Sequence, residues 1–420
     1  MLASPSVRRA LLALCLAGLV LRAGFLVLEP PVERMGDEPS WISLAVHGLG
    51  ELKHPLHPLS KHLLFYPPLY PFFLAVPYKL TGGLAAAQWA QVLVSALLIP
   101  AVGLIGARCF SARTALLAAA FVAFYPELAW FAAHFWSETL FLTLLFWGLE
   151  RALTASERGS TGAALASGAL LGLAALTRET ALPVALLAAA WLAPREGGRR
   201  AAALLLGAAL TVAPWTLRNW IVFRAFVPIS TYGALNLWLG NSDLDRDEVY
   251  RLSDSVEGPV AQYRLARAQA TAAIARRQPE WIFEKTASEL PALFAPSSEA
   301  LVFLECEAYG PVGAVARTIA AAAVVLPWLA LAFTGVAALA LFEPTRPRAL
   351  LLAFFVYHVV VHVVAFGHHR FHLPLLPVLA LFSAALLREP WVRERVWAAA
   401  VLVLAVAAVV LPGIVGFSAK

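Results

Sequence analysis

The sequence predicts an all-α polytopic membrane protein with about eleven transmembrane helices and interfacial helices in two large outer loops. Its 420 residues are 60% hydrophobic and only 14% charged, and the mean hydropathy is +0.74. A soluble domain is closer to half apolar and a quarter charged. Apolar runs of about 17–25 residues, long enough to cross a bilayer, recur along the chain. These observations exclude an ordinary soluble fold.

The apolar runs define the predicted transmembrane helices. The first run follows Arg8 and Arg9, as in a signal peptide, but Arg22 interrupts it and no small-residue cleavage site follows. We therefore interpret it as an uncleaved first helix. The predicted spans cover residues 10–28, 84–106, 114–131, 135–150, 162–177, 181–194, 201–217, 316–341, 349–366, 372–387 and 396–413.

Arginines in alternate loops predict the orientation of these spans. With the N-terminus inside, every short inner loop carries arginine, as the positive-inside rule requires. This placement accounts for much of the net charge of +6, so the basic excess does not indicate a nucleic-acid partner. The outer face then receives two large loops and all ten histidines, which suggests that polar chemistry collects there. The predicted division is an N-terminal transmembrane catalytic module at 1–217 that includes the outer loop 29–81, an outer loop region at 218–314, and C-terminal transmembrane helices at 315–420.

Local patterns predict helices inside both outer loops. The stretch "EPSWISLAVHGLG" has apolar residues at helical spacing and ends at a glycine, which is typical of an interfacial helix. Pro67, Pro68 and Pro71 exclude a regular helix start before about Pro71. The second loop is expected to hold two or more helices, with Pro279 suited to a helix start.

Acidic residues stand at the outer ends of two predicted helices. Asp37 and Glu38 follow the first span in "VERMGDEPSW", where acids near a first turn are favoured by the helix dipole and Pro39 suits that turn. They could also supply a base at the membrane surface, and the two interpretations are compatible. Glu138 could simply cap a helix with Ser137, but an acid that enters a hydrocarbon span is costly and indicates function.

Cations on the outer side are the candidate partners of these acids. Arg178 and Glu179 are adjacent in "TRETALP", and we expect them to pair with each other. Arg218 ends the seventh span against the positive-inside trend, so it either snorkels or binds an anion. Lys285 and Arg370 complete a set of three outer cations that could face two or three acids.

The histidines leave a metal site open as an alternative. His368, His369 and His372 have a spacing that could bind a divalent metal, with His358 and His362 one turn apart on the preceding span. Interfacial histidines that only form hydrogen bonds are the favoured interpretation, so no metal ligand or other cofactor is assigned. The three cysteines provide neither a metal set nor a disulfide framework.

Together these motifs resemble the polytopic C-type (GT-C) glycosyltransferases, which include protein O-mannosyltransferases, lipid A aminoarabinose transferases and rhizobial core galacturonosyltransferases. The resemblance covers nearly the whole chain and is weakest at 220–314. It is carried by "GDEPSW", "YPPLYPFFLA", "WSETLF", "TRETALP", "PWTLRNWIVFRAFVPISTYGALNLWLGN" and "RFHLPLLPVLAL".

The resemblance implies transfer of a sugar from a polyprenyl-phosphate-linked donor to an acceptor on the outer side of the membrane. It maps the catalytic carboxylate onto Asp37, with Glu38 beside it, and a further acid onto Glu138. The cations expected to hold the lipid phosphate are Arg218, Lys285 and Arg370. Aromatic residues could stack on the sugar or line an isoprenoid groove, and the candidates are Tyr66, Trp41 and Trp238.

Elementary chemistry is consistent with this function. A polyprenyl phosphate leaves readily once cations neutralise its charge, whereas the acceptor hydroxyl needs a positioned base. Attack on the anomeric carbon opposite the phosphate would invert its configuration. The expected partners are the lipid-linked donor, a cell-envelope acceptor (lipid, glycan or protein) and membrane lipids, in a bacterial cytoplasmic membrane with the active site facing the periplasm or exterior. The alternative is a transporter or flippase of lipid-linked sugars, which would more often show polar residues at mid-span and inverted repeats.

Overall fold

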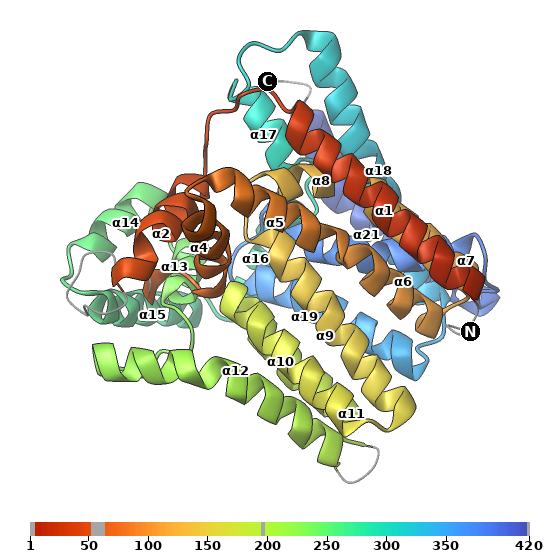
Figure 1. Ribbon diagram of the computed structural model, residues 1–420, viewed down its shortest axis with the longest axis horizontal. Helices are drawn as coiled ribbons and strands as arrows, with labels where there is room; N and C mark the ends of the chain where they lie inside the picture. The colour runs from red at the N-terminus through yellow and green to blue at the C-terminus, as the bar shows by residue number, and fades with distance from the viewer. Residues whose placement is uncertain (1–4, 52–63, 195–197, 418–420) are drawn as a thin grey trace.

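The computed structural model describes residues 5–51, 64–194 and 198–417, and all regular structure in these ranges is helical (Figure 1). His54, His57 and His62, three of the histidines predicted on the outer side, lie outside the described residues. The helices of the first half are α1 (Pro5–Leu28), α2 (Glu38–Glu51), α4 (Leu69–Thr81), α5 (Leu84–Ala96), α6 (Leu98–Cys109), α7 (Ala112–Phe124), α8 (Pro126–Ala133), α9 (Glu138–Arg158), α10 (Thr161–Thr177), η1 (Glu179–Ala181), α11 (Leu182–Leu192) and α12 (Arg199–Phe223). Those of the second half are α13 (Tyr232–Asn241), α14 (Arg246–Asp254), α15 (Pro259–Arg276), α16 (Trp281–Leu293), α17 (Glu299–Glu305), α18 (Ala314–Leu341), α19 (Arg346–Val364), η3 (His369–Leu375), α20 (Leu376–Leu386), η4 (Arg393–Arg395) and α21 (Val396–Phe417).

Each predicted span coincides with a helix or a pair of helices, so the all-α membrane fold is confirmed. The count of eleven is not confirmed. Within the described residues, six helices are long and apolar enough to cross a membrane, or seven if the bent pair α7 and α8 forms one span. The pair is bent by 50° at Tyr125, because Pro126 disfavours helical geometry in the residue before it.

Arg22, which interrupts the first apolar run, is buried inside the bundle rather than exposed to lipid. Its guanidinium donates to the carbonyls of Val122 and Ala123 at 2.9 and 2.8 Å and to Gly18 at 3.0 Å. The last carbonyls of α7 lack partners within their own helix, so a cation there satisfies and stabilises the helix end. The charge therefore joins α1 to α7 without breaking the span.

Two glycines make a very close contact between the long helices α10 and α12. A Cβ added at Gly168 in α10 would lie 1.8 Å from the carbonyl oxygen of Leu204, and one at Gly207 in α12 would lie 2.1 Å from the carbonyl oxygen of Leu165. The two backbones therefore touch directly, as small residues permit in membrane helices. Figure 1 shows α9, α10 and α12 running alongside one another.

Four helices of the two predicted loops, α2, α13, α14 and α15, lie near one another at one side of the long helices in Figure 1. Helix formation at "EPSWISLAVHGLG" is confirmed as α2, and the second loop holds several helices as expected. Three of these helices, α13 to α15, form a small core of their own. Its buried members are Leu235, Trp238, Val249, Ala266 and Ala270.

Candidate functional site

Asp37 lies at the turn that begins α2. Gly36 just before it has φ +60°, a conformation that favours glycine, and an added Cβ would meet the Trp136 ring at 2.8 Å. The Asp37 carbonyl accepts the backbone N–H of Trp41 at 3.1 Å, which leaves the side chain free to point away from the helix. Its carboxylate accepts a hydrogen bond from Arg370 at 3.0 Å and is 29% exposed.

A chain of alternating charges continues from this pair into the protein. The Arg370 guanidinium lies 3.1 Å from Oε1 of Glu138, and the same oxygen accepts a hydrogen bond from Arg178 at 2.6 Å. Arg370 also stacks over the Trp136 ring, with 4.5 Å from Cζ to the centroid. Two carboxylates and two guanidiniums therefore form one network, Asp37–Arg370–Glu138–Arg178. The Glu138 side chain is almost fully buried because α9 begins there against the rest of the bundle.

The Asp37–Arg370 pair stands in the shared wall of two cavities. One, of about 310 Å³, is mainly apolar and also contains Arg178 and Glu179. The other, of about 640 Å³, is more polar and extends to Glu299. The residues that line both cavities are Asp37, Tyr232, Asn236, Phe366, Arg370 and Phe371. This arrangement places a carboxylate and a guanidinium between the two cavities. An apolar ligand in one cavity and a polar ligand in the other would meet there.

Glu38, expected beside Asp37 in the site, lines neither cavity. It is the first residue of α2 and fully buried, and its carboxylate accepts the backbone N–H of Phe135 at 2.7 Å and a guanidinium N–H of Arg34 at 3.0 Å. Burial raises the pKa of Glu38, and Arg34 and the backbone donors act in the opposite direction. Adjacent residues at a helix start point in different directions, so only one of the two acids reaches the cavities.

Of the three predicted cations, only Arg370 contacts the acids. Arg218 stacks on Trp215 within its own helix, 4.8 Å from Cζ to the ring centroid, and lines neither cavity. Lys285 is buried and donates to Glu289 at 2.6 Å and to the carbonyl of Ala365 at 3.1 Å. Arg218 and Lys285 therefore do not contact Asp37 or Glu138 in the described structure, and their expected role at a lipid phosphate stays a prediction.

Of the predicted aromatic residues, Tyr66 and Trp41 line a cavity at Asp37 and Trp238 does not. Tyr66 lines the apolar cavity next to Trp41, with ring centroids 4.8 Å apart. Burial raises the pKa of Tyr66, and the negative charge of Asp37 adds to this effect. Trp238 is buried in the small core of α13 to α15 and lines neither cavity, so its contact with a ligand stays a prediction.

Arg178 and Glu179 do not pair with each other. Arg178 is in an extended conformation, with φ −149° and ψ 122°, which directs neighbouring side chains to opposite sides. Arg178 turns to Glu138, whereas Glu179 accepts a hydrogen bond from Ser230. Burial raises the pKa of Glu179 to about 7, and hydrogen bonds from Ser230 and Gly233 act in the opposite direction. The adjacent charges in "TRETALP" predict a local ion pair, and that prediction is wrong because the two side chains have different partners.

The histidine group is divided between two environments. His372 is buried against Trp328, with ring centroids 3.8 Å apart, and Nε2 of His358 lies 2.8 Å from the carbonyl oxygen of Phe371. His368 and His369 instead face Glu299, whose carboxylate lies 3.7 and 3.5 Å from their ring nitrogens.

Glu299, His368 and His369 are the residues that could hold a metal ion. Their ligand atoms lie within 4.8 Å of one another, and Nε2 of His369 is buried without a hydrogen-bond partner in the described structure. Two imidazoles and one carboxylate are a donor set that divalent transition metals accept. Glu299, which the sequence analysis missed, begins α17, where Ser298 caps the helix. The residues therefore fit a divalent cation beside the Asp37–Arg370 pair.

Comparisons with known proteins agree with this architecture. The family model described as dolichyl-phosphate-mannose-protein mannosyltransferase matches residues 66–219. The oligosaccharyltransferase AglB from Archaeoglobus fulgidus, in complex with an inhibitory peptide and a dolichol-phosphate, aligns with a TM-score of 0.53 and 16% identity over 98% of this chain and 55% of that one. The chain has the fold of the GT-C glycosyltransferases. The resemblance found in the sequence is thus confirmed at the level of the fold.

Further comparisons define the extent of this GT-C similarity. The same archaeal enzyme in complex with Zn and sulfate aligns with a TM-score of 0.52 and 16% identity, over 97% of this chain and 52% of that one. The chain therefore spans about half the length of the archaeal enzyme. ArnT from Cupriavidus metallidurans bound to undecaprenyl phosphate aligns with a TM-score of 0.45 and 14% identity, over 97% and 64% of the two chains, and adds nothing to the fold assignment. No curated protein sequence matches the chain.

Proposed function

We propose that this GT-C protein transfers a sugar from a polyprenyl-phosphate-linked donor to a hydroxyl of a cell-envelope acceptor, at the outer face of a bacterial cytoplasmic membrane. The observation that carries the proposal is the Asp37–Arg370 contact of 3.0 Å in the wall between an apolar and a polar cavity. The family model and the fold support a glycosyltransferase. The archaeal protein of this fold that was solved with dolichol-phosphate supports a lipid-linked donor.

The apolar cavity is the proposed site for the donor. Its lining is dominated by apolar and aromatic side chains, which suit the first isoprenoid units. Arg370 and Arg178 stand in the same cavity and present guanidinium groups that bind phosphate oxygens in a bidentate manner. In the described structure the Asp37 carboxylate occupies one face of Arg370. We infer that the donor phosphate takes this place and releases Asp37.

The released carboxylate is the proposed general base. Asp37 is 29% exposed and lines the polar cavity, from which the acceptor hydroxyl approaches. The hydroxyl oxygen forms a bond to the anomeric carbon while the bond from that carbon to the phosphate oxygen breaks, and the hydroxyl proton passes to Asp37. The departing polyprenyl phosphate keeps the electron pair, and Arg370 and Arg178 neutralise its charge. Attack from the side opposite the phosphate inverts the anomeric configuration.

The other acids have positioning roles in this scheme. Glu138 accepts from Arg178 and contacts Arg370, so it fixes both guanidiniums in the cavity. Glu38 joins the start of α2 to Phe135 and thereby fixes the direction of Asp37. A divalent cation on Glu299, His368 and His369 would add positive charge near the phosphate. The archaeal protein of this fold solved with Zn supports a metal in this part of the proposal.

The test compares Asp37→Asn with the matched control Glu33→Gln in the purified protein. Glu33 is an exposed acid four residues earlier in the same segment. With an undecaprenyl-phosphate sugar and membrane extract as the source of acceptors, Asp37→Asn should lower the rate of transfer by about 10²–10⁴-fold, because a general base contributes this much. Donor binding, measured with the radiolabelled lipid, should remain. Glu33→Gln should behave as the wild type.

Two results would overturn the proposal. Transfer by Asp37→Asn at the wild-type rate would exclude this carboxylate as the base. Movement of the intact lipid-linked sugar across proteoliposomes without transfer, unaffected by Asp37→Asn, would favour the transporter or flippase instead.

A further inference from the structure

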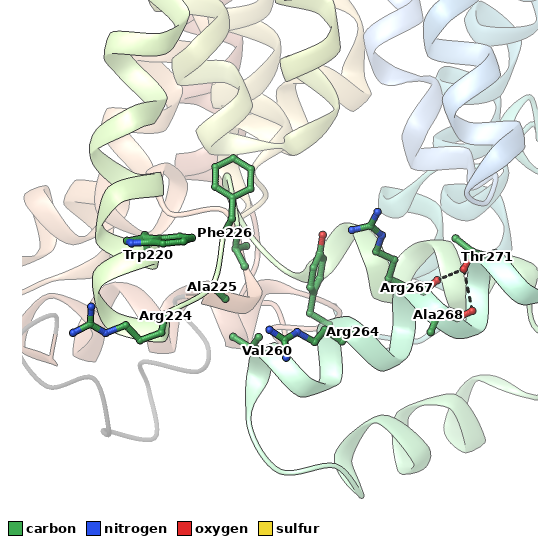
Figure 2. Close-up of a pocket in the computed structure, with 11 residues that line it drawn as sticks. Trp220, Arg224, Ala225, Phe226, Val260, Arg264, Arg267, Ala268 and Thr271 are labelled. Carbon is green, nitrogen blue, oxygen red and sulfur yellow. Dashed lines mark hydrogen bonds between the residues drawn. The ribbon is translucent and has the colours of Figure 1, made fainter.

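A separate pocket of about 500 Å³ lies at the end of α12, away from the residues that line the two cavities at Asp37. Figure 2 shows Trp220 and Arg224 on one wall, Ala225 and Phe226 between the walls, and Arg264 and Arg267 on α15 opposite. Nothing in the proposed transfer reaction uses these residues. Any ligand of this pocket is therefore independent of the proposed donor and acceptor.

The pocket carries positive charge that the described structure does not neutralise. Arg264 and Arg267 are three residues apart and so share one face of α15, and Arg224 follows the last residue of α12. All three side chains are exposed, and none lies within ion-pair distance of a carboxylate in the described ranges. Other arginines of this loop do have acid partners, as Arg251 has Glu248 at 3.4 Å. An uncompensated group of guanidiniums attracts an anion, and phosphate is the anion that fits their geometry.

An apolar groove continues from the same pocket along a membrane-spanning helix. A second hollow of about 660 Å³ lies between α11 and α12, and Trp220 and Phe226 line both it and the basic pocket. Its other lining residues are apolar except Thr216, whose hydroxyl bonds to the carbonyls of Val212 and Pro228. Trp220 and Phe226 are 51% and 67% exposed, which is typical of aromatic residues at the level of lipid headgroups.

We propose that the basic pocket and the groove together bind one phosphate-bearing anionic membrane lipid. Its phosphate contacts Arg264 and Arg267, and one of its chains lies along α12 toward Leu205. The charge selects the headgroup, and the apolar groove selects a lipid over a soluble phosphate. This site is distinct from the donor cavity, and it does not depend on the proposed transfer reaction.

The test measures lipid binding to the intact protein by native mass spectrometry in detergent. The probes are phosphatidylglycerol, an uncharged diacylglycerol with the same chains, and inorganic phosphate. We expect phosphatidylglycerol to bind, and the other two to bind far more weakly. Replacing both Arg264 and Arg267 by glutamine should weaken phosphatidylglycerol binding by roughly 25-fold, since each basic residue near an anionic lipid contributes about fivefold. Replacing both by lysine should preserve most of the binding.

Matched controls separate this site from general charge and general hydrophobicity. Arg276→Gln removes an exposed arginine of α15 that does not line the pocket, and it should leave binding unchanged. Ala213→Trp fills the groove and should weaken binding, whereas Leu210→Trp, on the exposed surface of α12 outside the groove, should not. Asp37→Asn should bind the lipid as the wild type does, so this test is independent of catalysis.

Each contrary outcome rejects the lipid site. Equal losses in the Arg276→Gln control and the double variant would show attraction by general charge. Binding of inorganic phosphate as tight as that of the lipid would remove the role of the groove. Displacement of phosphatidylglycerol from the wild type by polyglutamate, together with unchanged binding in Ala213→Trp, would assign the pocket to an acidic protein.

Discussion

Substitution of Glu138 by glutamine should destabilise the protein more than substitution of Asp37 by asparagine, although both remove one negative charge. Glu138 is 3% exposed and contacts two guanidiniums, Arg178 at 2.6 Å and Arg370 at 3.1 Å. The glutamine variant leaves Arg370 with Asp37 as an ion-pair partner and leaves Arg178 with none in the described ranges. Asp37 is 29% exposed and contacts Arg370 alone among the cations of the described ranges.

The magnitudes follow from burial. Removal of one partner from a buried ion pair costs about 3–5 kcal/mol, because a charge is left uncompensated in a medium of low dielectric constant. Arg178 and Arg370 are 22% and 13% exposed, so water reduces this cost and we expect about 2–4 kcal/mol for Glu138→Gln. The more exposed contact of Asp37 should contribute about 1 kcal/mol or less.

The free energy of unfolding in detergent is measured by urea titration, with tryptophan fluorescence as the signal. The rate of sugar transfer is measured on the same variants. Glu138→Gln should lose both stability and activity, whereas Asp37→Asn should lose activity with at most this small loss of stability. If the two variants are destabilised equally, or if Glu138→Gln unfolds as the wild type does, Glu138 does not hold the two arginines in place and the charge network has been misinterpreted.

Three further predictions concern other parts of the chain. Gly36→Ala should lower the transfer rate at least about tenfold, because φ +60° and the adjacent tryptophan ring resist a methyl group. The control Gly83→Ala, where an added methyl group meets open space, should keep the wild-type rate. Steady-state kinetics of the two variants test this difference. Burial raises the pKa of Glu29 from 4.5 to about 7 despite its hydrogen bond from Tyr309, so the folded state binds this proton more tightly than the unfolded state does. Stability should therefore fall as the pH rises through this window, and Glu29→Gln should flatten the slope in unfolding titrations. His369→Ala should weaken binding of Mn²⁺ or Zn²⁺ at least about tenfold in calorimetry, and an unchanged affinity would exclude the proposed metal site.

Most of the helical segments could be predicted from the sequence because burial in a bilayer demands long apolar runs. The break at Tyr125 was not predicted, although Pro126 was visible, because proline also occurs inside continuous membrane helices such as α12 and α18. Whether proline bends a span depends on what packs against it. Arg22 was likewise visible as an interruption, but its partners at Val122 and Ala123 lie a hundred residues away.

The site could be predicted in kind but not in detail. Charge and position singled out Asp37, Glu138 and Arg370, and these three do meet. The chain separates Asp37 from Arg370 by 333 residues, so only the tertiary packing decides which outer cation reaches the acid. Sequence adjacency was misleading for Arg178, because an extended backbone directs it away from Glu179.

The glycine contact between α10 and α12 determines which parts of the protein can move. With Gly168 and Gly207 bringing one backbone against the other, no layer of side chains is left between the helices to rearrange during a sliding motion. These two helices should behave as a single rigid block through the catalytic cycle. Any widening of the apolar cavity at Asp37 must then come from its other walls, among which α2, α13 and α19 take no part in this glycine contact.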